Sequence, residues 1–373
     1  MRTRLLSWLG VIALGLLAVP GCGEETNGGE GGATASGGTG PGGTGGGQPG
    51  GAGGTGATGG TGAAGGATGG SAPTVVTLAV DGDIAQEGLT DRARDVAALI
   101  TGHTPAVSGV LLGGDNARFD GSGSLLDYYQ TYWQPAGEAN WGQFDVMAFP
   151  QNGNHEYSET DAQGYFDYFA GRLGAIAALP GYSGDAGTVG KGWYSVNIAG
   201  WHIVSLNSNC GDVGGCETGS EQETWLAADL SAHPGMPIIA IWHAPRYTCG
   251  SHGDATEMQD MWADLYAAHA DFAFSGHNHF YQRWKPLDAT DPEAVEDDAA
   301  GITGIVVGSG GVSTYSVCAG GDPRIASEIG GDEGIGVLFL TISSDGSYSF
   351  EYQLRSDGSI FDSGSGVAHN APP

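Results

Sequence analysis

Short apolar runs alternate with amphipathic stretches from residue 73 onward, and this pattern predicts alternating strands and helices. The first run, residues 75–80, is apolar and β-branched, as in a buried strand, and residues 91–100 follow with apolar positions at helical spacing. Further strands are predicted over residues 107–112, 144–149, 237–242 and 271–274. The intervening helices are predicted over residues 221–230 and 258–269.

The pattern changes after residue 300. Residues 302–307, 337–342 and 348–354 are strand-like and are separated by polar turns too short to hold helices. An α/β half followed by a mostly antiparallel half predicts two stacked sheets flanked by helices. The sequence shows no internal repeat of this domain and no second domain.

The first residues resemble an export signal. Arg2 and Arg4 precede an apolar run, residues 5–19, that is short for a membrane span. The run ends at Cys22, which follows a small residue as in a bacterial lipobox, although Pro20 is unusual there. We therefore expect a signal peptide over residues 1–21 and a lipid anchor on Cys22. The alternative is ordinary signal cleavage, which leaves Cys22 as an incidental thiol.

Residues 22–72 are almost entirely Gly, Thr, Ala and Ser, and we expect a disordered linker there. Fifty residues of flexible coil reach about 40 Å, which suits a stalk. A fibrous or adhesive role is the alternative, but the repeat is irregular and has no Gly-X-Y period. The predicted folded domain spans residues 73–365, and residues 366–373 are predicted to be a flexible tail.

Charge narrows the range of partners. The formal net charge is -30, from 42 acidic and 12 basic side chains. Such a chain repels nucleic acid and anionic lipid headgroups, so neither is expected as a general partner. Because Lys and Arg are scarce, bound metal ions are the natural source of positive charge for holding a phosphate group.

Four cysteines follow the linker, and an even number in an exported domain suggests two disulfides. Cys210 and Cys216 bracket a short Gly-rich segment, which would leave Cys249 to pair with Cys318. The sequence alone does not fix this pairing. A cysteine metal site is less attractive because the chain has no CxxC pair.

Polar segments stand at five predicted strand ends: residues 80–85, 111–116, 151–156, 241–245 and 275–279. Open α/β sheets bind ligands beyond the carboxyl ends of their strands, so these segments are expected to meet. Taken singly, each has an ordinary structural explanation, such as a turn or a helix cap. Five such segments in this order are difficult to obtain by chance.

The set resembles the calcineurin-like metallophosphoesterases and, among them, purple-acid-phosphatase-like bacterial enzymes. The resemblance covers residues 77–311 and rests on Asp83, Gly-Asp115, Gly-Asn154-His-Glu, His243 and Gly-His277-x-His. It implies an α/β fold, a four-layer α/β/β/α sandwich of two mixed sheets flanked by helices. It also implies a phosphoric ester hydrolase with a dinuclear metal site.

The metal ligands that the resemblance implies are Asp83, Asp115, Asn154, His243, His277 and His279. Asp115 would bridge two cations, with Asp83 and His279 on the first and the remaining three residues on the second. Carboxylate, amide and imidazole ligands suit divalent ions or iron (Fe, Zn, Mn or Mg) and not soft copper(I).

The implied chemistry is hydrolysis by a metal-bridging hydroxide, because two close cations lower the pKa of a shared water. His155, next to a predicted ligand, is placed to stabilise developing charge or to protonate the leaving oxygen. His252 matches a substrate-pocket histidine of the family, and a surface-loop histidine is an equal alternative. Arg246 and Tyr247 are weaker candidates for substrate contact.

Two positions depart from the family pattern. Many members carry His two residues after the first Asp, where this chain has Ala85, and the purple enzymes carry Tyr where it has Arg118. We therefore predict a weaker first metal and no tyrosinate-to-iron colour. Arg118 is expected to reach the substrate phosphate instead.

The leading functional interpretation is an exported, acid-phosphatase-like phosphomonoesterase that acts on a small phosphate ester. It would be a bacterial cell-envelope lipoprotein or a secreted protein that meets the membrane only through Cys22. The alternatives are a phosphodiesterase or nucleotidase at the same site, or a surface binding protein that has lost turnover.

Overall fold

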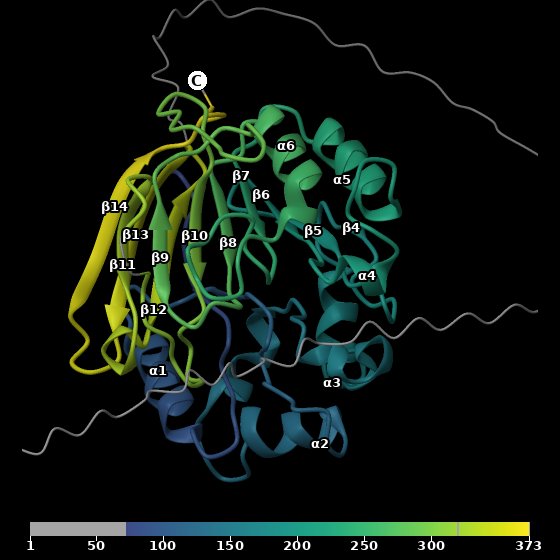
Figure 1. Ribbon diagram of the computed structural model, residues 1–373, viewed down its shortest axis with the longest axis vertical. Helices are drawn as coiled ribbons and strands as arrows, with labels where there is room; N and C mark the ends of the chain where they lie inside the picture. Colours follow the sequence, from purple (N-terminus) through teal and green to yellow (C-terminus); the bar gives the residue numbers. More distant parts are fainter. Residues whose placement is uncertain (1–71, 319–320, 373) are drawn as a thin grey trace, which may run out of the picture. The chain divides into compact units, whose positions relative to one another are not determined.

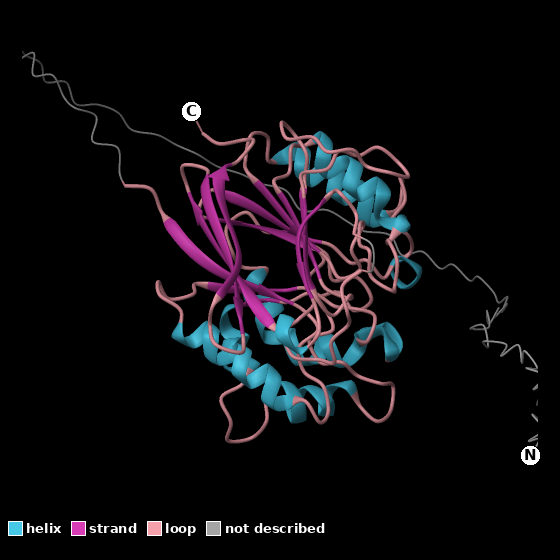
Figure 2. Ribbon diagram, turned by 60° about the vertical axis from the view of Figure 1, so that its left-hand side comes forward, coloured by secondary structure: helices cyan, strands magenta, loops and turns pink. Residues whose placement is uncertain are grey.

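Two β-sheets stack face to face, and helices cover their outer sides (Figures 1 and 2). The computed structural model describes residues 72–318 and 321–372. The predicted signal peptide, Cys22 and nearly all of the predicted linker lie outside the described residues. The four layers are those of an α/β/β/α sandwich, so the predicted fold class is confirmed.

The first sheet has the strand order β14-β13-β12-β1-β2-β3. Its strands are β1 (Val75–Asp81), β2 (Gly109–Leu112), β3 (Ala148–Phe149), β12 (Gly336–Ser343), β13 (Ser347–Leu354) and β14 (Ile360–Val367). The first three are parallel, whereas β12 pairs antiparallel with β1 and leads into an antiparallel meander. The carboxyl ends of β1, β2 and β3 therefore open at one edge.

The second sheet has the order β11-β9-β10-β8-β7-β6-β5-β4. Its strands are β4 (Ser183–Gly184), β5 (Tyr194–Ile198), β6 (Trp201–Ser205), β7 (Ile238–Ile241), β8 (Phe272–Ser275), β9 (Tyr281–Trp284), β10 (Thr303–Val307) and β11 (Ile325–Ile329). Its central strands β6, β7, β8 and β10 are parallel. The loops that leave β7 and β8 therefore also emerge together.

Helices α1 and α3 lie on the side of the first sheet, and α5 and α6 lie on the side of the second (Figure 1). The helices are α1 (Thr90–Gly102), α2 (Leu125–Tyr128), α3 (Gln163–Ile176), α4 (Cys210–Val213), α5 (Glu221–Ala232) and α6 (Gln259–Ala267). Shorter turns are η1 (Tyr129–Trp133), η2 (Trp141–Met147), η3 (Glu156–Ser158), η4 (Thr160–Ala162), η5 (Thr256–Met258) and η6 (Asp332–Gly334). Within the part of the chain that the structure describes, no helix is both long and apolar enough to cross a membrane.

Alternation along the strands divides the apolar side chains between two cores. In β7, Ile239 and Ile241 face the first sheet, whereas Ile238 and Ala240 face α5 and α6. Contact between the sheets is direct, since the rings of Phe272 and Tyr348 lie 4.9 Å apart. Each fully buried Ile or Phe contributes about 1.5–3 kcal/mol, so this double-sided burial fixes the strand register and the strand ends.

The prediction of a strand over residues 144–149 is correct only for Ala148 and Phe149. The preceding residues form η2, because the Asn140 side chain accepts a hydrogen bond from the Trp141 backbone amide and starts a helical turn. The Trp141 indole then donates to the carbonyl of Ala93 and anchors the turn on α1. A cap and one aromatic anchor thus override the apolar run.

The tail expected from residue 366 is instead ordered through residue 370. Residues 366 and 367 end strand β14, and Ala368 is buried. The His369 amide donates to Asp271, and the Asn370 side chain donates to two backbone carbonyls. These polar contacts with distant residues leave no periodic pattern in the sequence.

Both predicted disulfides are present. Cys210 pairs with Cys216 and Cys249 pairs with Cys318, with Cα–Cα distances of 5.2 and 5.7 Å. The second bridge spans 69 positions and joins the loop after β7 to the segment before β11. The alternative of a cysteine metal site is thereby excluded for these four residues.

Candidate metal centre

Loops from both sheets meet at the carboxyl ends of their strands, as the sequence predicts. The amide of Asp83, after β1, donates to the carbonyl of Gly114, after β2, at 3.0 Å. The amide of Gly276, after β8, donates to the carbonyl of His243, after β7, at 2.9 Å. Gly114 is essential to this arrangement, because a Cβ there would lie 2.7 Å from Nδ1 of His243.

One group of side chains converges on Nε2 of His243. This atom lies 3.0 Å from Oδ1 of Asn154, 3.2 Å from Nδ1 of His277 and 3.4 Å from Oδ2 of Asp115. His243 and Asp115 are almost fully buried, whereas Asn154 is exposed. The group is therefore enclosed on the side of His243 and Asp115 and open to solvent on the side of Asn154.

A second group joins Asp83 to His279. Nε2 of His279 lies 3.2 Å from Oδ1 of Asp83, yet this buried oxygen has no hydrogen-bond partner. The other oxygen of Asp83 accepts from the backbone amide of His277 at 2.6 Å. Atoms of Asp83, Asp115 and His243 lie within 4.8 Å of one another, so the two groups are continuous.

Three of these residues have a left-handed backbone. The φ angles are 56° at Asp83, 48° at Asp115 and 68° at His277. This conformation is uncommon outside glycine and costs free energy that the surrounding structure must supply. Its recurrence at three of the converging side chains indicates a site whose geometry is enforced by the fold.

Backbone carbonyls orient two of the imidazoles. Nδ1 of His243 lies 2.8 Å from the carbonyl of Gly113, and Nδ1 of His279 contacts the carbonyl of Ser313. A carbonyl only accepts, so Nδ1 carries a proton in both rings and Nε2 is directed into the site. This is the usual outer contact of a metal-bound histidine.

Glu156 holds two of the loops together, a role that sequence analysis did not assign. Its Oε2 accepts from the amides of Asp115, at 3.0 Å, and Gly153, at 2.7 Å, and its Oε1 accepts from the hydroxyl of Tyr129 at 2.8 Å. Burial, together with the charge of Asp115, raises the pKa of Glu156 to about 7. The available signal was its place directly after Asn154 and His155 in one motif.

Burial and neighbouring charges shift the pKa values of the buried side chains in this centre. Burial disfavours the charged form of His243, but Asp115 outweighs this effect and raises the pKa of His243 to about 10. Burial, reinforced by His243, lowers the pKa of His277 to about 3. Burial acts against ionisation of Asp115 as well, but His243 and His155 hold its pKa below the ordinary value. The proton on His243 thus lies where a bound cation would otherwise place positive charge.

Both histidines that were predicted to be catalytic lie beside this cluster. His155 is tied through its amide to Asp115 at 2.8 Å, and its Nε2 lies 3.9 Å from the same carboxylate. His252 is exposed, and its ring centroid lies 4.4 Å from that of His277. The structure therefore brings all eight predicted site residues together.

Other candidates are placed differently. Arg246 is 1 % exposed and bonds Gln259 and Asp291, so it holds a loop in place and does not reach the opening. Ala85 is fully buried in a bridge to Ala117. Arg118 is partly buried, and its Nε has no hydrogen-bond partner among the described residues.

The side chains fit a pair of metal ions. The partnerless Oδ1 of Asp83 lies in a buried position where an ion would satisfy it, and Nε2 of His243 is surrounded by three potential ligand atoms. The mixture of imidazole, carboxylate and amide is the one preferred by borderline divalent ions and iron.

Comparison with known proteins agrees with this geometry. The family model for calcineurin-like phosphoesterases matches residues 76–281, more than half of the chain. This chain belongs to the calcineurin-like phosphoesterase family. Phosphoesterases of the purple-acid-phosphatase type use two metal ions, which agrees with the Asp and His groups of the present site.

Relatives within this family include plant purple acid phosphatases. Purple acid phosphatase 18 of Arabidopsis thaliana is 30 % identical over 243 residues, which cover 63 % of this chain and 50 % of the relative. Purple acid phosphatase 21 of the same plant is 32 % identical over 125 residues, covering 32 % of this chain and 26 % of the relative. The chain thus spans half or less of the length of these relatives.

Solved structures show the same fold. Purple acid phosphatase PPD1 from yellow lupin (Lupinus luteus) has a TM-score of 0.60 at 16 % identity, covering 80 % of this chain and 56 % of that one. GAP50, the anchor in the inner membrane complex of Plasmodium, has a TM-score of 0.56 at 12 % identity, covering 79 % and 89 %. At such identities the likeness concerns architecture alone.

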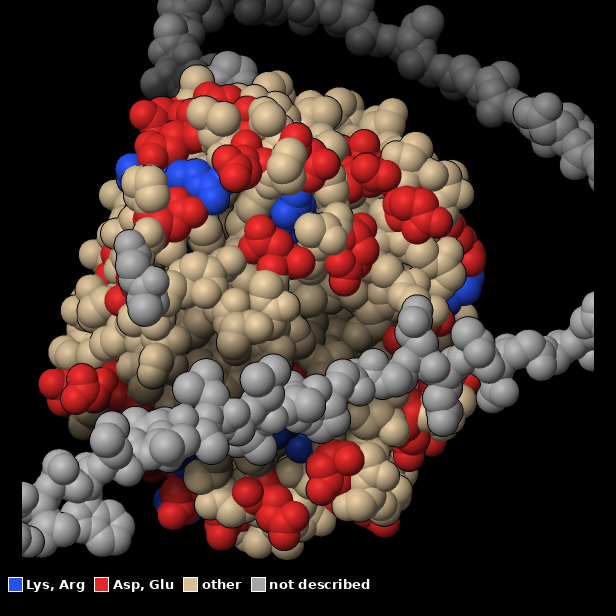
Figure 3. Space-filling model, in the orientation of Figure 1, with Lys and Arg blue, Asp and Glu red and all other residues tan. Residues whose placement is uncertain are grey.

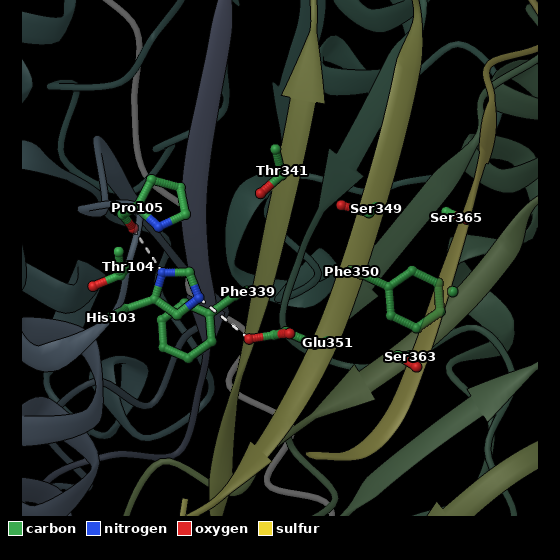
Figure 4. A pocket seen from close by; sticks show the side chains of 11 residues that line it. His103, Thr104, Pro105, Phe339, Thr341, Ser349, Phe350, Glu351, Ser363 and Ser365 are labelled. Atoms are coloured by element: carbon green, nitrogen blue, oxygen red, sulfur yellow. Dashed lines mark hydrogen bonds and ion pairs between the residues drawn. The ribbon is translucent and has the colours of Figure 1, made fainter. Parts of the chain in front are cut away.

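A separate hollow of about 470 Å³ lies on the outer face of the first sheet (Figure 4). Its rim includes His103, which stacks on Phe339 and lies 3.3 Å from Glu351, while Ser349 and Ser363 line the sheet face. Its side chains come from the segment directly after α1 and from β12, β13 and β14, and not from the loops that carry the candidate ligands. This hollow is therefore separate from the candidate metal centre.

Most of the charged side chains on the face shown in Figure 3 are acidic, including those over α5 and α6. This surface repels a phosphate ester at long range. An anion would therefore have to be attracted by local positive charge and not by this surface.

Proposed function

We propose that this chain is an exported phosphomonoesterase with two metal ions at the strand ends. Asp115 would bridge them, Asp83 and His279 would complete one, and Asn154, His243 and His277 would complete the other. The observation that carries the proposal is that Asn154, His277 and Asp115 all approach Nε2 of His243. Beside this point, a buried oxygen of Asp83 lacks a hydrogen-bond partner.

Two bound ions would supply an activated water and would neutralise the charge of the phosphate group. The chain itself positions the substrate. Asn154 and His252 are both exposed, so they border the side from which a phosphate ester enters. The deeper residues are shielded from water, which strengthens their electrostatic effect on the reacting group.

His155 is suited to donate a proton to the leaving oxygen. Its Nδ1 lies 2.6 Å from the carbonyl of Phe119, which fixes a proton on that nitrogen. Nε2 is then the nitrogen directed at the site, 3.9 Å from Oδ2 of Asp115. Nε2 is therefore the atom from which a proton would pass to a leaving oxygen.

Arg118 would contact a phosphate oxygen from the first-metal side. The Arg118 side chain is partly exposed, and a guanidinium binds phosphate with well-defined geometry. Arg118→Ala should raise the KM for an aryl phosphate several-fold, with Arg118→Lys intermediate. An unchanged KM would contradict this role.

The central test measures metal content and turnover together. The purified domain, residues 73–373, should hold two metal ions and hydrolyse an aryl phosphate monoester faster than the corresponding diester. Asp115→Ala should abolish both metal binding and turnover, whereas Asp120→Asn, at an exposed carboxylate, should leave both intact. Faster diester turnover would favour a phosphodiesterase, and absence of metal and turnover would favour a binding protein.

Export is supported by the two disulfides and by the N-terminal pattern of Arg2, Arg4 and an apolar run. We propose a lipid anchor on Cys22 with residues 23–72 as a stalk and a membrane-bound or secreted location. Labelling with a radioactive fatty acid should mark the wild type and not Cys22→Ser. Equal labelling of both proteins would reject the anchor.

A further inference from the structure

The segment after β10 contacts both loops that carry Asp83 and His279, the predicted ligands of the first metal. The amide of Val312 donates to the carbonyl of Asp83 at 3.2 Å, and the carbonyl of Ser313 contacts Nδ1 of His279. The amide of Tyr315 then donates to the carbonyl of His279 at 2.9 Å. These three contacts hold the segment against both Asp83 and His279.

The Tyr315 ring lies flat on one of those ligands. Its centroid is 4.1 Å from that of the His279 imidazole, and the two planes differ by 12°. A stacked ring of this kind prevents the imidazole from turning about its own axis and shields one face from water. Together with the Ser313 carbonyl, it defines where Nε2 of His279 is directed.

The Tyr315 hydroxyl contacts the other wall of the site. It lies 3.3 Å from Nε2 of His252, and the two ring centroids are 5.5 Å apart. His252 is exposed, so a hydrogen bond at its distal nitrogen limits the orientations that its ring can adopt. Tyr315 therefore connects a metal ligand with a residue at the substrate opening.

The predicted site of the first metal has few protein ligands, so the position of each one matters. Ala85 and Arg118 follow Asp83 and Asp115 closely in the chain, and neither side chain has an atom that binds a cation. Only Asp83, Asp115 and His279 remain on the protein for that ion. With fewer ligands, the affinity depends more on how well each remaining side chain is held before the ion binds.

We propose that Tyr315 is a positioning residue of this centre, whose ring fixes His279 for the first metal and whose hydroxyl fixes His252 for the substrate. The inference rests on the proposed two-metal phosphoesterase function. It separates into two parts, because the ring acts on metal binding and the hydroxyl acts on substrate binding.

Two variants distinguish the ring from the hydroxyl. Tyr315→Ala removes both, and we expect one of the two metals to bind roughly ten- to a hundredfold more weakly in a Mn²⁺ titration. Tyr315→Phe keeps the ring, so Mn²⁺ affinity should stay unchanged while the KM for an aryl phosphate rises roughly three- to tenfold. Tyr266→Phe removes the hydroxyl that bonds Asp297, and it is the matched control.

A double-mutant cycle tests whether the hydroxyl acts through His252. In a His252→Ala background, Tyr315→Phe should cause no further rise in KM. An additional rise equal to that in the wild type would overturn the hydroxyl part, and unchanged Mn²⁺ affinity in folded Tyr315→Ala would overturn the ring part. If Tyr315→Ala does not fold, Tyr315→Leu replaces it as the test of the ring part, and Tyr315→Phe with wild-type KM still rejects the hydroxyl part.

Failure of the proposed function would look different. If the wild-type protein binds two Mn²⁺ ions but hydrolyses no ester, the proposed phosphatase function is rejected. The effect of Tyr315→Ala on Mn²⁺ affinity would then still decide the role of the ring.

Discussion

Nε2 of His243 lies 3.2 Å from Nδ1 of His277, so two imidazole nitrogens face each other across the candidate metal centre. Only one proton fits between them. With a pKa of about 10 for His243 and about 3 for His277, the first ring carries it and the second accepts. A cation bound between Asn154, Asp115 and these rings would take over the role of that proton.

Metal removal should therefore destabilise the protein reversibly. A ligand that binds only the folded state adds about 2.7 kcal/mol at a hundred times its Kd. We expect chelation to lower the Tm by several degrees and added Mn²⁺ to restore it. His277→Ala should reduce this metal-dependent rise, whereas His369→Ala, near the C-terminus, should retain it. A Tm that does not respond to metal would refute a site of useful affinity.

Glu156→Gln should damage the centre without removing a predicted ligand. Its carboxylate accepts from the amides of Asp115 and Gly153 and from the hydroxyl of Tyr129, all of which are donors. The Gln amide group would place a donor against one of them, leaving a buried group unsatisfied at a cost of about 1–3 kcal/mol. Urea unfolding and metal analysis measure the two effects.

The control for this variant is Glu333→Gln, at an exposed carboxylate in η6. It should leave both unfolding and metal content unchanged. Equal metal content in Glu156→Gln and the wild type would show that Glu156 stabilises the loops but does not organise the centre.

The sequence located the candidate ligands in two steps. Strands such as β2 and β7 indicate that Asp115 and His243 emerge at the same edge, and the resemblance to a known family then implies that they are ligands. Tyr315 has no such neighbour. It stands in an irregular segment whose position depends on contacts with Asp83 and His279, and no local pattern encodes these.

Corrections to the fold have a similar origin. Residues 141–147 form a turn because of one Asn140 cap and one Trp141 contact with α1. Residues 366 and 367 end β14, and residues 368–370 are held because His369 and Asn370 bond two remote loops. Each depends on a few polar contacts with particular partners, whereas the predicted strands depend on several apolar positions that repeat.

The Cys249–Cys318 bridge should support substrate binding. Cys249 stands three residues before His252, and Cys318 stands three residues after Tyr315, so the disulfide closes the wall that these two side chains form. A Cys249→Ser/Cys318→Ser double variant should raise the KM for an aryl phosphate several-fold. It should also lose about 4 kcal/mol of stability, as expected for a loop of this length.

Matched removal of the other disulfide provides the comparison. Cys210→Ser/Cys216→Ser opens a separation of only six residues and should cost less stability. If both double variants show the same KM as the wild type, the disulfide between Cys249 and Cys318 has no role in shaping the opening.

A carboxyl group far from the metal centre should make stability depend on pH. Burial of Asp264 in α6, together with the nearby Glu223 of α5, raises the pKa of Asp264 from 3.8 to about 6. Between these values the folded state holds a proton that the unfolded state has released. Stability attributable to this group is therefore present below pH 4 and is lost as the pH rises to 6.

Asp264→Asn removes this titration while keeping a neutral side chain that can donate to Glu223. The variant should match the wild type near pH 4 and be more stable at pH 7 to 8. Because Asp264 is only half-buried, solvent screening limits the gain to about 1 kcal/mol. Urea unfolding at the two pH values, with Glu257→Gln as an exposed control, measures it. The same free-energy difference at both pH values would exclude Asp264 as the cause, since only a group that titrates between them can change the difference.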